Sequence, residues 1–190
     1  MYDAAVVGGG PAGQSAAIFL GRSGLKTVLL DNEKGLTKRA LLKNHYGTGE
    51  LTGEELVKAG RKQVENSGTE IHHAQVTTIH QTDDGFSIET ESGETFEAKQ
   101  VILATGSNAR LARTIGLKTK EGQEKYVKTV IDTDPAGHTS INGIWAAGVA
   151  AGVSVHTIVT SGDGAKTAIN LISELKGERY TDHEAVPAKK

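Results

Sequence analysis

The first hydrophobic positions of the chain predict a strand, a helix and a second strand in close succession. Asp3–Val7 is a short apolar run, Ser15–Arg22 has the spacing of a helix, and Thr27–Leu30 is again apolar. Between the first strand and the helix lies the glycine-rich segment Gly8–Gly13, and the acidic residue Asp31 closes the second strand. This order is typical of a βαβ unit with a tight turn after its first strand.

Two longer segments further along the chain predict helices. Thr52–Glu55 has the sequence of a capping box and opens a helix that continues to about Asn66. Ile158–Lys176 carries apolar residues at helical spacing, and Gly177 after it is a typical helix stop.

Short apolar runs between these helices predict strands. They are Glu70–His73, Val76–His80, Phe86–Glu91, Glu94–Ala98, Gln100–Ala104, Tyr126–Ile131 and Ile144–Ala147. The unbroken run Gln100–Ala104 favours a central parallel strand, and the turn residues among the three runs before it favour a small antiparallel sheet. The polar stretches Leu36–Gly49 and Ser107–Lys125 favour loops, and Thr181–Lys190 favours a frayed tail.

The glycine-rich segment carries the first chemistry. Gly8 permits the turn, Gly10 lets backbone amides approach a pyrophosphate, and Gly13 lets the helix and strand pack closely. The positive end of the helix then faces the phosphates, and Asp31, about 20 residues further on, accepts from a ribose hydroxyl. The segment therefore predicts adenine-dinucleotide binding; the alternative is a glycine-rich turn of purely structural use.

Composition excludes several other classes of function. The formal net charge is −2 and the basic residues are scattered, so we expect no binding to nucleic acid or to a membrane surface. The first residues contain neither a basic region nor a long apolar stretch, which predicts no signal peptide, no membrane span and a cytoplasmic location. With no cysteine, the chain cannot form disulfides, thiolate nucleophiles or a CxxC redox centre, and its seven histidines lack metal-site spacing.

Three motifs carry a family resemblance. Gly8–Gly13, Ala104-Thr105-Gly106 and Gly143–Gly148 stand in the order of the FAD domain of the glutathione-reductase superfamily. Asn44–Gly47 and Thr139–Ile144 resemble two further runs of its low-molecular-weight thioredoxin-reductase branch. The resemblance covers residues 1–106 and 126–177. It implies an α/β fold, a three-layer ββα Rossmann-type FAD-binding domain over residues 1–180, with a central parallel sheet, a small antiparallel sheet and a tail at 181–190.

The resemblance also shows what this chain lacks. In that family an NADPH-binding domain that carries the CxxC is inserted between the second and third motifs. Here the connector 107–125 has roughly 20 residues, where a domain needs on the order of 100. We therefore expect no NADPH domain and no disulfide reduction by the family mechanism.

The resemblance further implies a set of positions that contact FAD. These are Gly8, Gly10, Pro11, Ala12, Gly13, Asp31, Asn32, Arg39, Asn44, Val76, Ala104, Thr105, Gly106, Gly148, Val149, His156, Thr157 and Ile158. For Arg39 the alternative is a solvated surface charge.

Two of these positions depart from the family. Val149 replaces an aspartate that hydrogen-bonds the ribityl chain, which predicts weaker FAD binding by roughly tenfold to a hundredfold. His156 stands near flavin N1 and O2, where negative charge develops on reduction, and so predicts flavin tuning. The alternative for His156 is a surface or packing histidine.

Two functions remain open at this point. The first is an FAD-dependent oxidoreductase that takes electrons from free NAD(P)H or from a partner protein, in a homodimer as the family implies. The second is a non-catalytic FAD-binding or redox-sensing subunit. A related alternative is that the same cleft binds NAD in place of FAD.

Overall fold

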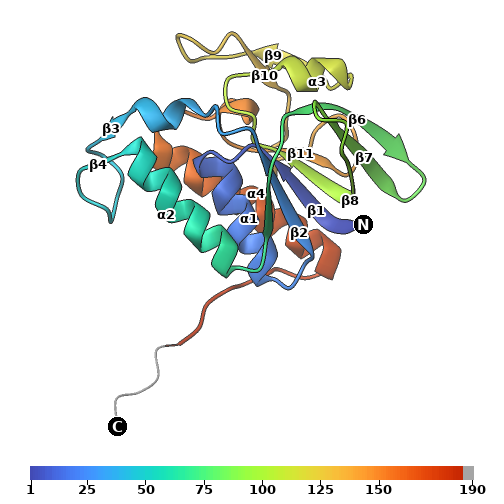
Figure 1. The fold of residues 1–190 in the computed structure, drawn as a ribbon, viewed down its shortest axis with the longest axis horizontal. Coiled ribbons are helices and arrows are strands. Elements are labelled where there is room, and N and C mark those ends of the chain that lie inside the picture. Colours follow the sequence, from blue (N-terminus) through green and yellow to red (C-terminus); the bar gives the residue numbers. More distant parts are fainter. Residues whose placement is uncertain (186–190) are drawn as a thin grey trace.

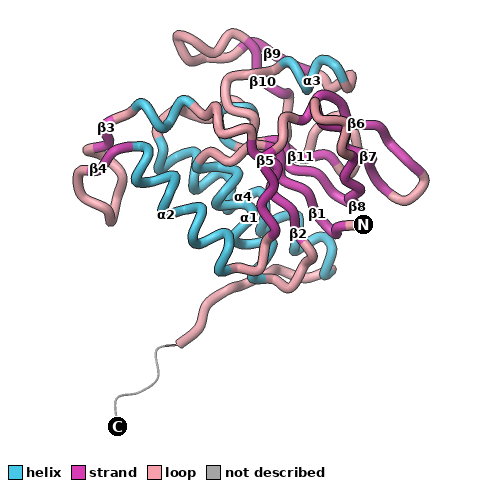
Figure 2. The backbone as a smooth tube through the Cα atoms, viewed as in Figure 1, coloured by secondary structure: helices cyan, strands magenta, loops and turns pink. Residues whose placement is uncertain are grey.

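A parallel sheet forms the centre of the molecule, as the apolar runs predict. The computed structural model describes residues 1–185. Its parallel strands are β1 (Tyr2–Val7), β2 (Thr27–Asp31), β5 (Glu70–His73), β8 (Thr95–Leu103) and β11 (Ile144–Ala146). They lie side by side in the order β5-β2-β1-β8-β11 (Figure 1; Figure 2).

Strand β1 shows why both faces of this sheet must be covered. Successive side chains of a strand point to opposite faces, and all the residues from Ala4 to Val7 are buried. Ala4 and Val6 belong to one hydrophobic cluster, whereas Ala5 and Val7 belong to another. The sheet is therefore the middle of three layers, and the predicted ββα fold class is confirmed.

Three helices cover one face of the sheet (Figure 1). They are α1 (Pro11–Arg22), α2 (Gly53–Asn66) and α4 (Thr157–Lys176). The predicted capping box of α2 is confirmed, because Thr52 Oγ1 accepts from the amide of Glu55 and Glu55 Oε2 accepts from the amide of Thr52, at 3.2 and 2.7 Å. α4 ends at Gly177 in the left-handed conformation, as predicted.

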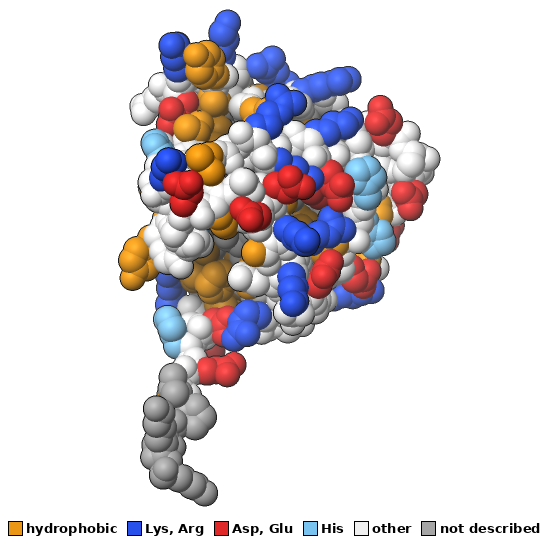
Figure 3. Space-filling view, turned by 60° about the vertical axis from the view of Figure 1, so that its left-hand side comes forward, with side chains coloured by type: hydrophobic (Ala, Val, Ile, Leu, Met, Phe, Trp, Pro, Cys, Tyr) orange, Lys and Arg blue, Asp and Glu red, His pale blue; other side chains and the backbone are white. Residues whose placement is uncertain are grey.

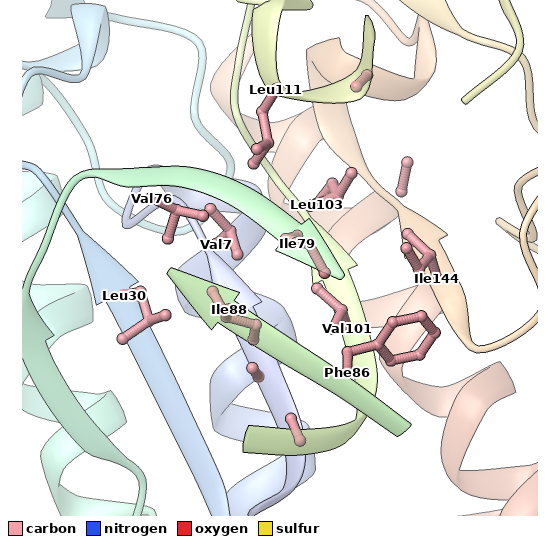
Figure 4. Close-up of a cluster of buried hydrophobic side chains, with 14 of the residues drawn as sticks. Val7, Leu30, Val76, Ile79, Phe86, Ile88, Val101, Leu103, Leu111 and Ile144 are labelled. Atoms are coloured by element: carbon pink, nitrogen blue, oxygen red, sulfur yellow. The ribbon is translucent and has the colours of Figure 1, made fainter. Parts of the chain in front are cut away.

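An antiparallel layer covers the other face. β6 (Val76–Thr82) pairs with β7 (Gly85–Thr90), and β7 pairs with the first part of β8. Figure 4 shows Ile79, Phe86 and Ile88 of this layer beside Val7, Leu30 and Val101 of the central sheet. Apolar contact between the two layers is therefore continuous.

Strand β8 belongs to both layers. The sequence predicted two strands, Glu94–Ala98 and Gln100–Ala104, but the structure has one continuous strand of nine residues. Residues 95–98 pair with β7, and residues 101–103 pair with β11. Along its other edge the strand pairs with β1. The polar residue Lys99 separates the two apolar runs in the sequence, but the backbone hydrogen bonding of the strand continues through it.

The start of α1 and the stretch Leu36–Gly49 also differ from the prediction. α1 begins at Pro11 and not at Ser15, because proline and small residues fit a first helical turn. The stretch Leu36–Gly49 contains a 3-10 helix (Leu36–Arg39) and β3 (Leu41–Leu42), which pairs with β4 (Leu51–Thr52).

The connector 107–125 is also folded, although its polar sequence favoured a loop. It contains α3 (Arg110–Thr114) and β9 (Thr119–Glu121). β9 pairs with β10 (Thr129–Ile131), so the predicted strand Tyr126–Ile131 is shorter than expected. Together α3, β9 and β10 form a small unit at the top of Figure 1.

The described part of the predicted tail, 181–185, contains no helix or strand. It is nevertheless held to the helical layer, since Arg22 of α1 forms an ion pair with Asp182. The rest of that prediction, 186–190, lies outside the described residues. Among the helices of residues 1–185, none has the length and apolar character needed to cross a membrane.

Candidate functional site

The candidate site lies at the carboxyl edge of the parallel sheet. From β1 the chain passes to β2 on one side, whereas β8 lies on the other side of β1. Ligands of open α/β sheets bind outside the carboxyl ends of strands at such a reversal of strand order. Asp31 is the last residue of β2, and Gly8, Ala104 and Ala147 directly follow β1, β8 and β11 at this edge. The topology therefore brings the three sequence motifs together.

Two glycines of the first motif are required by backbone packing. Gly8 has φ +111°, and a Cβ there would lie 2.3 Å from the carbonyl oxygen of Ala104. A Cβ on Gly13 would lie 1.8 Å from the carbonyl oxygen of Gly8. The turn is closed by the amide of Gly8, which donates to Leu30 O at 2.8 Å. Gly8 and Gly13 thus shape the turn.

Gly10 has a different environment. A Cβ built on Gly10 meets no atom within 4 Å, although the residue lies between a buried strand and a buried helix. Gly10 is the N-cap of α1, provides no side-chain cap, and is followed by a first turn without an acidic residue. The first amides of a helix need acceptors, and an anion placed there is favoured by the helix dipole. The open space is therefore a cradle suited to phosphate.

Asp31 connects the second strand to the glycine turn. Its Oδ1 atom accepts from the amides of Gly9 and Glu33, both at 3.1 Å. A Cβ on Gly9 would lie 2.3 Å from Asp31 Oδ2, so only glycine allows this approach. The carboxylate is thereby fixed at the strand end, with Oδ2 left to accept from a ligand.

A cavity of about 300 Å³ lies beside Asp31. Asn32, Lys34, His73, Gln75 and Glu91 are among its lining residues. The side-chain amide of Asn32 donates to Gln75 Oε1 at 2.7 Å. The side-chain amide of Gln75 in turn donates to the backbone carbonyl of Val76 at 3.1 Å. The side chain of Val76 itself is buried in the core, as Figure 4 shows, so only its backbone can face this cavity.

The second motif follows β8. The amide of Ala104 donates to Val7 O at 2.9 Å, which joins the motif to the end of β1. Thr105 Oγ1 donates to the carbonyl of Asn108 at 3.0 Å and so turns the chain toward the connector. Gly106 has φ +64°, and a Cβ there would meet nothing within 4 Å.

The third motif is held by a carboxylate that the sequence prediction missed. Gly148 has φ +70° and lies against Ala12 of α1. Its amide donates to Asp163 Oδ2 at 2.8 Å, and Asp163 Oδ1 pairs with Lys166 Nζ at 2.6 Å. Asp163 is only 7% exposed. The sequence did carry a signal for this contact, because Asp163 is an acidic residue that stands between Gly162 and Gly164 on the apolar side of a helix.

Two histidines from different parts of the chain lie at the amino end of α4. His156 is the exposed N-cap residue, and its Nδ1 lies 2.7 Å from Ser154 Oγ. The next residue, Thr157, is buried, and its Oγ1 lies 2.9 Å from Nδ1 of His45. That contact attaches the loop after β3 to the start of α4. Sequence reasoning singled out His156 and Thr157 but missed His45, which is distant in the chain.

The connector reaches the same region. The amide of Val155 donates to Glu124 Oε1 at 3.2 Å. The connector 107–125 therefore contacts the residues just before α4.

Arg39 is the last residue of the 3-10 helix, Asn44 lies in the loop between β3 and β4, and both residues are exposed. Within residues 1–185 neither side chain has a hydrogen bond or ion pair. Ile158 is 38% exposed at the start of α4. Hydrophobic side chains are grouped on the face seen in Figure 3, and the exposed ones in the chain include Leu36, Leu41, Tyr46, Val155 and Val159.

No group of three or more histidine, aspartate or glutamate side chains within residues 1–185 could hold a metal ion.

The family model described as pyridine nucleotide-disulphide oxidoreductase matches residues 2–136. The chain belongs to this family. Thioredoxin reductase of Aquifex aeolicus is 34% identical over 116 residues, which are 58% of this chain and 35% of that protein. Thioredoxin reductase of Helicobacter pylori is 34% identical over 132 residues, 66% of this chain and 40% of that protein. The chain thus spans well under half the length of these relatives.

Solved structures support the fold. The atypical thioredoxin reductase TRi from Desulfovibrio vulgaris Hildenborough has a TM-score of 0.82 at 19% identity, covering 94% of this chain and 99% of that chain. Thioredoxin reductase of T. acidophilum has a TM-score of 0.75 at 21% identity, covering 92% and 99%. The predicted resemblance to thioredoxin reductases is confirmed.

Proposed function

We propose that this oxidoreductase-family chain binds FAD along the carboxyl edge of its sheet and acts as an FAD-dependent oxidoreductase. The observation that carries the proposal is the cradle at Gly10, where open space meets an uncapped helix amino end at the reversal of strand order. The family match and the thioredoxin-reductase relatives support it further.

The residues along this edge fit a dinucleotide in sequence. Asp31 and Asn32 with the neighbouring cavity suit the adenosine half, Gly10 to Gly13 suit the pyrophosphate, and Gly106 leaves further open space. Gly148 lies against Ala12, so the last residue of the third motif lies next to the pyrophosphate cradle. The remaining predicted contacts extend the site to both ends: Pro11, Ala12, Arg39, Asn44, the Val76 backbone, Ala104, Thr105, Val149, His156, Thr157 and Ile158.

The chain's own residues orient the cofactor and adjust local charge. FAD, when bound, supplies the redox chemistry. The positive end of α4 and the His156 ring would stabilise negative charge at the pyrimidine side of the ring system. Since the chain has no cysteine, it offers no thiol of its own for exchange with a disulfide substrate.

Electrons come from free NAD(P)H or from a partner protein in this proposal. Within residues 1–185, no second GxGxxG turn stands between a buried strand and a helix to hold another dinucleotide. Reduction by free NADH or NADPH should therefore be slow and show little saturation. A homodimer, a cytoplasmic location and a single FAD-binding unit over residues 1–180 remain predictions.

The visible spectrum of purified protein mixed with FAD and desalted tests the binding proposal. We expect a retained flavin spectrum in the wild type and none in Gly10→Val, whose side chain would fill the cradle. Gly162→Val is the matched control, because Gly162 is exposed on α4 and a Cβ there also meets no atom within 4 Å. Equal FAD retention by all three proteins would contradict the proposal.

Turnover then separates an oxidoreductase from a binding subunit. We expect the FAD-loaded protein to pass electrons from NADH or NADPH to an artificial acceptor faster than the same concentration of free FAD. Turnover equal to that of free FAD would favour the non-catalytic subunit, and micromolar saturation with NADPH would reveal a nucleotide site that the proposal lacks.

A further inference from the structure

His138 lies between two carboxylates at the edge of β11 that does not pair with β8. Its Nδ1 atom is 2.8 Å from Oδ2 of Asp134, in the loop before it. Its Nε2 atom is 2.6 Å from Oε1 of Glu174, near the end of α4. The ring therefore joins the loop Asp134–His138 to a helix that comes later in the chain.

The number of protons on this ring decides how many of these bonds can exist. An ionised carboxylate only accepts hydrogen bonds, and a neutral imidazole has one N–H group. Both contacts of His138 can be hydrogen bonds only when the ring is an imidazolium, which donates from both nitrogens. A neutral ring would place a lone pair against one of the two carboxylates.

The same ring is packed on the strand that leads to the third motif. The imidazole lies on the indole of Trp145, with 4.0 Å between ring centroids and 36° between planes. Backbone bonding is continuous here, because His138 and Trp145 form an antiparallel bridge and the amide of Ala146 donates to Gly137 O at 2.9 Å. A charged ring is further favoured over an indole face.

Asp134 organises the loop on its own side. Its Oδ1 atom accepts from the amides of Ala136, Gly137 and His138 at 2.9 to 3.0 Å. With Oδ2 facing His138, both carboxylate oxygens are in use. The loop is therefore preformed around the carboxylate that the imidazolium contacts.

The charged groups that face His138 are Asp134 from the loop and Glu174 from α4, while β11 contributes the neutral Trp145. Asn170, also on α4, donates to the carbonyl oxygen of Ala136. Arg179, which follows α4 in the chain, donates to Asn170. Partial burial of His138 lowers its pKa, but hydrogen bonds and charge attraction from the two carboxylates outweigh this, so the pKa is raised. For Asp134, burial acts to raise the pKa, yet the bonds from His138 and the amides lower it overall.

We propose that His138 is a protonation-dependent clasp. As an imidazolium it holds the loop Asp134–His138 against the end of α4 through Glu174, and as a neutral ring it releases one of the two carboxylates. The clasp is independent of which cofactor occupies the carboxyl edge of the sheet.

The clasp has a structural target. A cavity of about 270 Å³ lies beside the loop. Asp134 and Gly137 of the loop and the preceding Thr133 line it, and so do Asp163 and Lys166 of α4. Asp163 is the residue that holds the Gly148 amide. Release of the loop at higher pH should therefore loosen the support behind the third motif.

The proton equilibrium can be measured directly by an NMR titration of the histidine ring resonances in the full chain, with and without added FAD. We expect the His138 midpoint to lie above the usual histidine value of about 6.5. Glu174→Gln should lower the midpoint, since it replaces a negative acceptor by a neutral group. Trp145 is the single tryptophan, so its fluorescence should follow the same titration and lose it in His138→Gln.

His80→Gln is the matched control, because His80 is an exposed histidine of β6 with its own glutamate, Glu89, 3.5 Å away. This variant should leave the Trp145 titration unchanged. A His138 midpoint at or below about 6.5, or one that Glu174→Gln does not move, would overturn the clasp. If His138→Gln fails to fold, Glu174→Gln still decides, since its side chain is 55% exposed.

Hydrogen exchange tests the release of the loop. At pH 6 the amides of Ala136 and Gly137, corrected for intrinsic rates, should exchange roughly three- to tenfold faster in Glu174→Gln than in wild type. At a pH above the His138 midpoint the two proteins should exchange equally. Equal exchange at pH 6 would mean that the ring does not hold the loop.

Discussion

The backbone amide of Gly148 donates a hydrogen bond of 2.8 Å to the buried carboxylate of Asp163. A helix residue thereby fixes the third glycine motif from behind, and the motif is followed by Val149, where the family resemblance predicts an acid. Charge-assisted bonds of this kind are stronger than neutral ones, and the arrangement makes Asp163 a test of how the motif is held.

Asp163→Asn should lower the free energy of unfolding by about 1.5 to 3 kcal/mol, because it weakens the bonds to Gly148 and Lys166 together. Urea denaturation at pH 7 measures the change. Lys166→Met is the control. The Lys166 side chain is 47% exposed, so its ion pair with Asp163 is partly screened by water. Loss of the Lys166 ammonium should therefore lower the free energy of unfolding by less than Asp163→Asn does. An unchanged stability in Asp163→Asn would show that the Gly148 bond contributes little.

Gly13→Val should fail to fold, whereas Gly10→Val should fold and lose FAD. A Cβ on Gly10 would meet no atom within 4 Å, so a valine there occupies only the open space. A Cβ on Gly13 would lie 1.8 Å from a backbone oxygen, a clash worth more than about 4 kcal/mol. Circular dichroism with thermal melting distinguishes the two variants. A folded Gly13→Val would contradict the close approach of Gly8 and Gly13.

Val149→Asp should tighten FAD binding by about tenfold to a hundredfold, because it adds one charge-assisted hydrogen bond. Lys166 already pairs with the neighbouring carboxylate of Asp163, which limits repulsion between the two acids. Titration with FAD measures the affinity, and Val149→Asn, of the same shape without charge, should gain less. Equal or weaker binding in Val149→Asp would mean that the backbone after Gly148 does not direct this side chain to the ribityl group.

His156→Ala should lower the FAD midpoint potential. Loss of a donor near flavin N1 and O2 disfavours the reduced state by roughly 1 to 3 kcal/mol, which is roughly 20 to 60 mV for two electrons. Spectroelectrochemistry measures the potential, with Val155→Ala as the adjacent, exposed control. An unshifted potential in His156→Ala would leave this residue a surface histidine.

His45→Ala should weaken FAD binding by a few fold and destabilise the protein by about 0.5 to 1.5 kcal/mol. The reason is loss of the 2.9 Å contact that attaches the loop after β3 to Thr157. Calorimetric titration and urea denaturation measure the two effects. Tyr46→Ala is a suitable control, since Tyr46 is 90% exposed, and it should change neither quantity. Identical behaviour of the two variants would remove His45 from the site.

Much of the fold could be predicted because its signals are local. The Thr52 capping box, the Gly177 stop and the glycine turn each specify a boundary within a few residues of sequence. The strands β3 and β4 could not be predicted in this way, since two residues are too few to show a period. The same holds for β9, which is exposed throughout and exists only by pairing with β10.

The candidate site also has one part that the sequence predicts and another that it does not. Gly8, Gly10 and Gly13 could be predicted because their spacing is itself the motif. The contacts from His45 to Thr157 and from Gly148 to Asp163 join residues 112 and 15 positions apart, and no periodicity predicts them. They follow from which helix packs beside which turn, and that is a property of the assembled layers.

The close approach of α1 and α4 also sets an order of events during synthesis. Ala12 precedes α4 in the chain, yet a Cβ on Gly164 of α4 would come within 2.0 Å of the carbonyl oxygen of Ala12, so the glycine turn rests against a helix that is translated later. β1 likewise gains its second neighbour only when β8 has left the ribosome. The first βαβ segment is thus translated before the elements that complete the packed walls of its phosphate cradle. A ligand that needs the complete cradle must therefore arrive after translation of α4.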